Sequence, residues 1–161
     1  MHVSIELVPR SKTYLIDQLE SIQEQLPTVN AINIPDLTRM DLRSWQGCRI
    51  VKPWFDLAIP HIRAADIRIE EPLPMLDEID AAGIDELLVV TGDLPPNGVA
   101  NGHYTSSLPV IERIKKERPH MKVYGALDPY RQSFIDEIAY ARTKVDYGAD
   151  GFLPSPFSIC A

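Results

Sequence analysis

The residues best suited to chemistry in this 161-residue sequence are polar side chains at the ends of short apolar runs. Glu6 is the most informative, because a carboxylate within the run 4–9 must face an accessible site or carry a burial penalty. Burial raises the pKa of a carboxyl group, which suits a general acid that stays protonated near neutral pH. The alternative is a structural Glu6 that pairs with Arg10 or Arg63.

Polar groups also stand at or just past the ends of the later apolar runs, with Asp36 after the second and Ser155 after the sixth. After the run that ends at Val90, Gly92 allows a sharp turn or a close approach to a flat ring, and Asp93 either faces the site or caps the next segment. His61 either hydrogen-bonds a cofactor or forms a hydrogen bond with a neighbouring loop. The turn 128–131, which begins at Asp128, suits a phosphate or ribose but is also a common turn type.

The elements that must position these groups alternate along the chain. Short β-branched or apolar runs predict strands, and each is followed by a loop and then by a segment with helical periodicity. Strands are expected at 2–7, 29–34, 57–62, 87–90, 122–127 and 151–153. Helices are expected from Ser11, through Trp45, from Pro72, from Ser107 and from Ser133, where the last presents Phe134, Ile138, Ala141 and Val145 as its buried face.

Six strands and five helices in strict alternation fit an open doubly wound sheet or a (β/α)₈ barrel that is cut short. No G-x-G-x-x-G segment follows the first strand, and polar groups stand at the ends of several different strands, which favours a barrel. We therefore expect an α/β fold: an incomplete parallel (β/α) barrel of TIM type with about six strands and five helices. The expected organisation is one domain, 1–161, without the last two strands.

The composition of the chain excludes some classes of binding partner. A net charge of −7 and a pI of about 5.0 argue against a nucleic-acid or polybasic membrane-surface protein. The apolar runs are too short to cross a bilayer and 1–10 lacks the pattern of a signal peptide, which predicts a cytoplasmic protein. Cys48, Cys160 and the four histidines have no metal-site spacing, so neither a disulfide framework nor a metal is expected.

Read in order, these positions resemble the shorter microbial methylenetetrahydrofolate reductases. That family begins with a Ser-x-Glu-x-x-Pro strand, matched at 4–9, and has Pro-His at the end of the third strand, matched at 60–61. Its Gly-Asp-x-Pro segment is matched at 92–95, its Ala-x-x-Pro turn at 126–129, and its Lys-x-x-x-Gly-Ala-Asp segment at 144–150.

The resemblance implies a flavoenzyme of one-carbon metabolism that passes a hydride from NADH or NADPH through FAD to 5,10-methylenetetrahydrofolate, giving 5-methyltetrahydrofolate for methionine biosynthesis. Glu6 would protonate a folate nitrogen so that the methylene bridge opens to an iminium, and Asp93 would bind the pterin and tune the flavin. The residues expected to bind FAD are His61, Gly92, Asp93, Ala126, Asp128, Lys144 and Ala149.

The sequence also departs from the family. The second strand ends Asn33-Ile34-Pro35-Asp36, where members commonly place a threonine that contacts the flavin. Asp128 stands where many members have a tyrosine, and 154–158 lacks the usual Thr-Gln. A second hypothesis is therefore that the chain is an inactive remnant or a partner subunit that binds flavin or pterin without turnover. The chain could also form a homo-oligomer. A lyase or aldolase with a Schiff base on Lys144 is disfavoured, because Lys144 is expected on a helix rather than on a strand.

Overall fold

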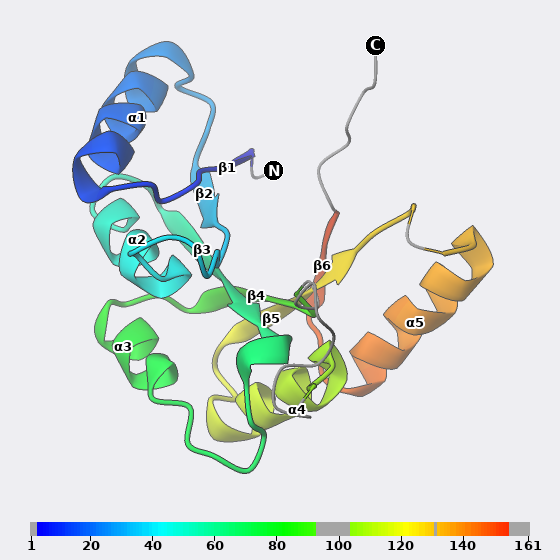
Figure 1. Cartoon of the computed structure of the whole chain (residues 1–161). Coiled ribbons are helices and arrows are strands. Elements are labelled where there is room, and N and C mark those ends of the chain that lie inside the picture. The colour runs from blue at the N-terminus through cyan, green and yellow to red at the C-terminus, as the bar shows by residue number, and fades with distance from the viewer. Residues whose placement is uncertain (1–2, 93–103, 131, 155–161) are drawn as a thin grey trace. The chain divides into compact units, whose positions relative to one another are not determined.

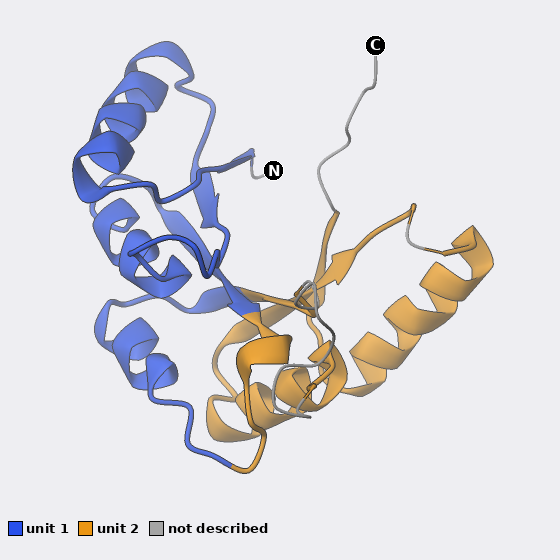
Figure 2. Cartoon of the chain, viewed as in Figure 1, with its two compact units in different colours: residues 1–62, 71–87 blue, residues 63–70, 88–161 orange. Residues whose placement is uncertain are grey.

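The structure is a computed structural model that describes residues 3–92, 104–130 and 132–154. Figure 1 gives the order of its helices and strands. The chain divides into two compact units, shown in Figure 2: unit 1 comprises Met1–Ile62 and Glu71–Leu87, and unit 2 comprises Arg63–Glu70 and Leu88–Ala161. Each unit is described by itself, and the expectation of a single domain stays a prediction.

Unit 1 contains three parallel strands with helices between them. Its strands are β1 (Ser4–Glu6), β2 (Ala31–Ile34) and β3 (Leu57–Arg63), of which β3 ends at the unit boundary. Its helices are α1 (Lys12–Gln25), α2 (Ser44–Val51) and α3 (Met75–Ala81). As the sequence predicts, the Ser11 hydroxyl accepts a hydrogen bond from the Tyr14 N–H and so caps α1.

Unit 1 has an apolar core beneath its helices. Leu15 and Leu19 of α1 and Cys48 of α2 are fully buried. Burial raises the pKa of the Cys48 thiol well above its ordinary value, so this cysteine is an unreactive packing residue. Helix α3 begins at Met75 rather than at Pro72, and Gly83 follows it with the positive φ that stops a helix.

Unit 2 contains a second parallel pair of strands. Its elements are η1 (Ala64–Asp66), most of β4 (Glu86–Val90), α4 (Ser107–Glu117), β5 (Lys122–Leu127), α5 (Phe134–Asp146) and β6 (Gly151–Pro154). β5 and β6 are parallel neighbours. Asp150 accepts hydrogen bonds from the Val123 N–H (2.8 Å) and the Lys115 ammonium (3.0 Å), and this network fixes the loop that enters β6.

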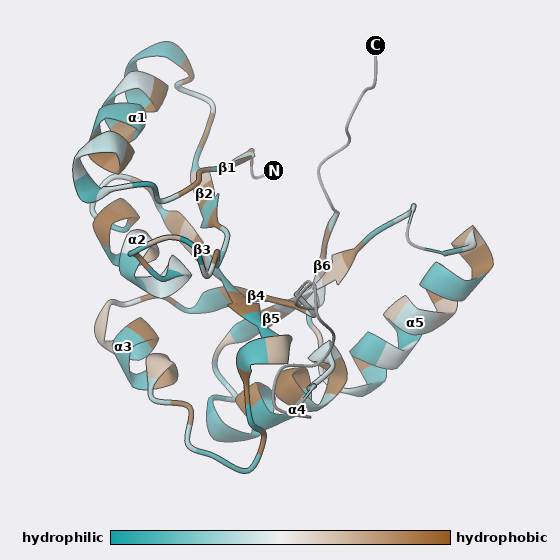
Figure 3. Ribbon diagram, viewed as in Figure 1, coloured by the Kyte–Doolittle hydropathy of each residue, from teal (hydrophilic) through white to brown (hydrophobic). Residues whose placement is uncertain are grey.

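The predicted inner face of α5 is wrong. Phe134, Ile138 and Val145 are 69%, 38% and 50% exposed, whereas the buried residues of the helix are Glu137 and Lys144. Figure 3 shows both apolar and polar segments along α5. Periodicity identifies an apolar stripe, but it does not say that unit 2 covers that stripe. Here the helix attaches through its polar side.

The expectation of a TIM-type barrel is also wrong. In the described part of the chain, six strands follow the order β1-β2-β3-β4-β5-β6 in one open sheet, with β1 and β6 as its edges. A barrel requires the first and last strands to pair, and no local sequence pattern specifies that long-range pairing. The fold is α/β with an open sheet and five α-helices in the described residues.

Candidate functional site

One face of the strands β1, β2 and β3 in unit 1 carries several polar side chains. In this parallel register Glu6 lies opposite Asn33, and Asn33 lies opposite Ile59, two residues before His61. Since side chains alternate along a strand, Ser4, Glu6, Asn33 and His61 share one face, which we call the polar face. On the opposite face Ile32 and Ile34 are fully buried, and α2 packs against Ile34 at Gly47.

Hydrogen bonds join three residues of the polar face. The Asn33 side-chain amide donates to the Ser4 hydroxyl (2.9 Å), and the Asn33 carbonyl oxygen lies 3.0 Å from Nε2 of His61. One interaction runs from β1 to β2 and the other from β2 to β3. Asn33 therefore connects the three strands at the level where Glu6 stands.

Glu6 lies at the end of β1 with its side chain 40% exposed. Partial burial raises the pKa of its carboxyl group above the ordinary value. Within the described ranges, no residue hydrogen-bonds this carboxyl, and its nearest recorded contact is Nε2 of His61 at 3.9 Å. The structural alternative has less support, because Arg10 instead lies over the Tyr14 ring. Glu6 is thus accessible and holds its proton more strongly than an ordinary glutamate.

His61 is buried at the carboxyl-terminal part of β3. Burial lowers the pKa of its imidazole to about 4, although the negative charge of Asp36 acts in the opposite direction. His61 is therefore neutral at neutral pH. The 3.9 Å pair is consequently not a salt bridge between two full charges.

A second, buried network holds the backbone of His61. Asp36, between β2 and α2, accepts from Nε of Arg43 (2.8 Å) and from the Ser44 N–H (3.2 Å). The Ser44 hydroxyl then donates to the carbonyl oxygen of His61 (2.5 Å). Asp36 is only 4% exposed. Asp36 accepts a hydrogen bond from a backbone N–H at the start of α2 and positions Ser44. Its role is therefore structural.

In unit 2, Gly92 directly precedes the predicted Asp93, which lies outside the described residues along with Arg131. Gly92 has φ of +85°, a conformation that favours glycine, and a Cβ there would meet the Arg63 guanidinium at 3.1 Å. The positive φ agrees with the expectation that this position needs the conformational freedom of glycine. The neighbour of Gly92 within unit 2 is the Arg63 cation, which is paired with Asp66 at 3.1 Å.

The predicted FAD-binding residues Ala126, Lys144 and Ala149 lie together in unit 2. The Lys144 ammonium donates to the Ala126 carbonyl oxygen and lies 4.4 Å from the centre of the Tyr140 ring. The Ala149 N–H donates to the Lys144 carbonyl oxygen (2.9 Å). Lys144 is 3% exposed, so its charge holds α5 against β5. Its location on a helix agrees with the argument against a Schiff-base lysine.

Asp128 follows β5 in a turn that is held from within. Its carboxylate accepts from the Tyr130 N–H (2.9 Å), and its own N–H donates to Glu137 of α5 (3.1 Å). Glu137 also accepts from the Gln132 amide (2.8 Å). These bonds match the turn interpretation of Asp128, in which aspartate supports its own loop.

These contacts test whether the unit 2 residues fit FAD. The flavin cofactor needs hydrogen-bond donors for its phosphates and ribose, and the Lys144 ammonium and the Asp128 N–H are both engaged internally. In this conformation the set fits FAD poorly, and FAD binding stays a prediction. His61, the remaining expected contact, belongs to the polar face of unit 1.

Gly125 has a specific packing role in this region. A Cβ on Gly125 would meet Cδ of Lys144 at 2.9 Å, and Lys144 is fixed by its bond to Ala126. We expect Gly125→Ala to lower the free energy of unfolding by about 1–3 kcal/mol through overpacking. Urea unfolding of Gly125→Ala, Lys144→Ala and the double variant measures this loss of stability. In the double variant the shortened side chain at position 144 no longer meets the added Cβ, so the two losses should not add. Additive losses would contradict the packing role of Gly125.

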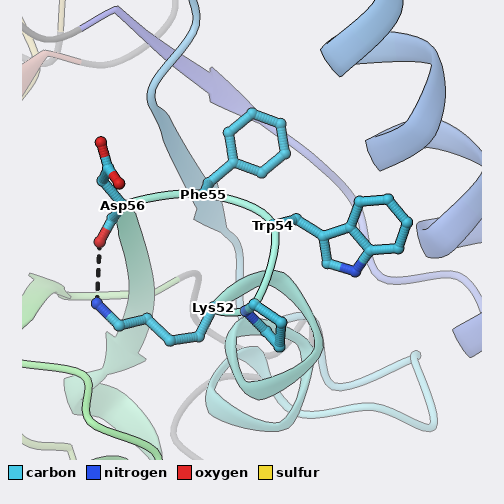
Figure 4. A pocket seen from close by; sticks show the side chains of 5 residues that line it. Lys52, Trp54, Phe55 and Asp56 are labelled. Atoms are coloured by element: carbon cyan, nitrogen blue, oxygen red, sulfur yellow. Dashed lines mark hydrogen bonds between the residues drawn. The ribbon is translucent and has the colours of Figure 1, made fainter.

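A pocket of about 320 Å³ lies away from the polar face, where the chain passes from α2 to β3. Figure 4 shows its lining by Lys52, Trp54, Phe55 and Asp56, with the Lys52 ammonium donating to the Asp56 carbonyl oxygen (2.9 Å). The Gln23 amide donates to the carbonyl of Trp54 (2.8 Å) and fixes this loop to α1. None of the predicted site residues lines the pocket.

The described residues contain neither a metal-binding cluster nor a helix suited to crossing a membrane. Across 3–92, 104–130 and 132–154, no group of three or more His, Cys, Asp or Glu side chains is arranged to hold a metal ion. In the same ranges, no helix has the length and apolar character that crossing a membrane requires.

Sequence reasoning did not identify Asn33. A signal was present, because Asn33 is the polar residue of an otherwise apolar strand and occupies the same relative place in β2 as Glu6 in β1. Ser44 was missed as well, and its bond to a backbone carbonyl has no sequence signature. The structure thus adds Asn33, which links His61 to Ser4 on the face that also carries Glu6.

No family model matches the sequence, and no curated protein matches it. A solved structure is similar in fold, with a TM-score of 0.64 at 14% sequence identity over 97% of this chain. It is described as an uncharacterized protein from Clostridium thermocellum that binds two copies of 5-methyl-5,6,7,8-tetrahydrofolic acid. The chain spans 55% of that protein's length, and the likeness establishes a shared fold.

Proposed function

We propose that this chain binds a reduced folate at the polar face of unit 1, with Glu6 as the acid that faces a folate nitrogen. The observation that carries the proposal is Glu6 itself: an accessible carboxyl with a raised pKa, beside a neutral His61, on a fold shared with a protein described as binding 5-methyl-5,6,7,8-tetrahydrofolic acid. The match of 4–9 to the reductase motif independently points to the same residue.

The finer proposal is methylenetetrahydrofolate reductase chemistry. Its product, 5-methyltetrahydrofolate, is the compound named for the structural neighbour. In the step that this chain's residues support, the O–H bond of Glu6 breaks and its proton passes to a nitrogen of the methylene bridge. The carbon–nitrogen bond then breaks, its electron pair stays on the protonated nitrogen, and the other nitrogen forms the iminium. The resemblance implies that the hydride for this iminium would come from NADH or NADPH by way of FAD, and no described residue of unit 2 is given a role in that transfer.

A binding protein without turnover is the second candidate. It is favoured by one observation: the unit 2 groups expected to hold FAD are engaged internally. In this case the polar face would hold the folate, and Glu6 would donate a hydrogen bond instead of a proton.

Binding and colour distinguish these possibilities. Calorimetric titration with 5-methyltetrahydrofolate should give saturable binding in the micromolar range, about −8 kcal/mol. Titration with folate's p-aminobenzoylglutamate fragment serves as a control, because it lacks the pterin that would meet Glu6. No binding of the complete molecule at millimolar concentration would refute the folate proposal. A flavin absorbance band that NAD(P)H bleaches supports the reductase, and folate binding by a colourless protein supports the second candidate.

A further inference from the structure

We propose that Asn33 is a positioning residue that holds His61 with its proton on Nε2 and directs that proton away from Glu6. The role assigned to His61 is independent of any ligand. Its consequence for folate, that the Glu6 carboxyl is left free for the bound molecule, depends on the function proposed above.

The first step of the argument is the competition for one imidazole nitrogen. Nε2 of His61 lies 3.0 Å from the Asn33 carbonyl oxygen and 3.9 Å from Oε2 of Glu6. Only the shorter distance is a hydrogen bond. An amide oxygen can only accept, so Nε2 carries the proton and donates it to Asn33.

The second step is the orientation of the Asn33 amide. Its nitrogen donates to the Ser4 hydroxyl at 2.9 Å, which leaves its oxygen facing His61. The reverse orientation would have the amide nitrogen donate to His61 and would place the imidazole proton on Nδ1. The two arrangements therefore predict different tautomers, which makes the assignment measurable.

The third step is the restraint on His61 from its other side. The Ser44 hydroxyl donates to the His61 carbonyl at 2.5 Å, the Ser44 N–H donates to Asp36, and Asp36 is in turn held by Arg43. The backbone of His61 is thus fixed from the first residue of α2 while its ring is fixed from β2. With both ends held, the imidazole is restrained from turning toward Glu6.

The consequence concerns Glu6. If Nε2–H donated to the Glu6 carboxylate, it would stabilise the ionised form and lower the pKa of Glu6, so that less of the carboxyl would keep the proton that it could donate. Because Asn33 accepts that hydrogen bond instead, the His61 N–H does not stabilise the Glu6 carboxylate. Its hydrogen-bonding capacity is then left for a ligand nitrogen at the polar face.

The test uses the free, full-length protein labelled with ¹⁵N-histidine, with the His61 signals assigned by His61→Gln. Long-range ¹H–¹⁵N spectra at pH 7 should show Nε2 protonated and Nδ1 unprotonated. In Asn33→Ala the tautomer should become mixed, and in the isosteric Asn33→Asp the new carboxylate should raise the pKa of His61 by about 1 or more. Ser4→Ala should produce a smaller change than Asn33→Ala, since it removes only the outer bond.

Asn30→Ala is the matched control, because it removes an asparagine side chain that accepts from the Val3 N–H at the same β1–β2 junction. It should leave the tautomer unchanged. An Nδ1–H tautomer in the wild type, or identical His61 signals in the Asn30 and Asn33 variants, would overturn the positioning role. Should the tautomer respond as expected while Asn33→Ala and the wild type bind 5-methyltetrahydrofolate equally, the positioning role stands and its link to folate fails.

Discussion

Glu6→Gln is expected to slow the opening of the methylene bridge of methylenetetrahydrofolate by about 100-fold or more, which is the usual contribution of a general acid. Glutamine keeps the size and hydrogen-bonding ability of a protonated glutamate but has no proton to transfer. Binding of 5-methyltetrahydrofolate should therefore survive. The measurement is the rate of conversion of the methylene compound, together with calorimetric affinity for the methyl compound.

The pH dependence of binding gives the same substitution a readout without turnover. Since burial raises the pKa of Glu6, the wild type should bind more tightly as the pH falls through that pKa, and Glu6→Gln should show no such change. Glu20→Gln is the matched control, because Glu20 is an exposed glutamate on α1 of the same unit. Parallel pH profiles for the wild type and Glu6→Gln would exclude Glu6 from the site.

His61 is expected to make the protein lose stability as the solution becomes mildly acidic. In the unfolded chain its pKa is near 6.5, whereas burial lowers it to about 4 in the folded protein. Between these values the unfolded state binds the proton and the folded state does not, so unfolding becomes more favourable as the pH falls. The full effect, reached below pH 4, is about 3 kcal/mol.

Other groups with shifted pKa values do not account for this window. Asp150, whose pKa is lowered, contributes stability that is lost only at pH values below about 4. Glu6, whose pKa is raised, acts in the opposite direction, but its side chain is 40% exposed and solvent weakens the effect. The loss of stability between pH 6.5 and 4 should therefore belong to His61.

Urea unfolding from pH 7.5 to 4 in the wild type and His61→Gln tests this assignment. Glutamine retains a donor for Asn33 but cannot titrate, so the variant should lose much less stability over the interval. His120→Gln, at an exposed position between α4 and β5, should keep the wild-type dependence. If His61→Gln instead loses stability as steeply as the wild type, the titrating group lies elsewhere.

Local sequence signals predict the elements of this fold well. Ser11 and Ser133 both accept hydrogen bonds from the first turns of the helices they cap, and Gly83 and Gly148 have the positive φ expected after a helix. Such features depend on residues a few positions apart. The absence of barrel closure and the exposure of Phe134 depend on what lies across the structure, which alternation and periodicity do not encode.

The candidate site divides in a similar way. Glu6 and His61 are recognisable because a charged or titratable residue in an apolar strand needs an explanation. Their relation is not recognisable, since it depends on the register of β1, β2 and β3 and on the amide orientation of Asn33. The structure places Lys144 in an internal contact with Ala126 that its residue type alone did not predict.

The attachment of α5 has a consequence for how unit 2 tolerates sequence drift. Its outward apolar residues contribute little burial, so random replacement there should be nearly neutral for folding. Its inward residues, Glu137, Tyr140 and Lys144, meet their partners through directional bonds that few other side chains reproduce. In most helices the hydrophobic positions tolerate substitution least. In α5 we expect the reverse, with the polar positions constrained and the hydrophobic positions tolerant of substitution.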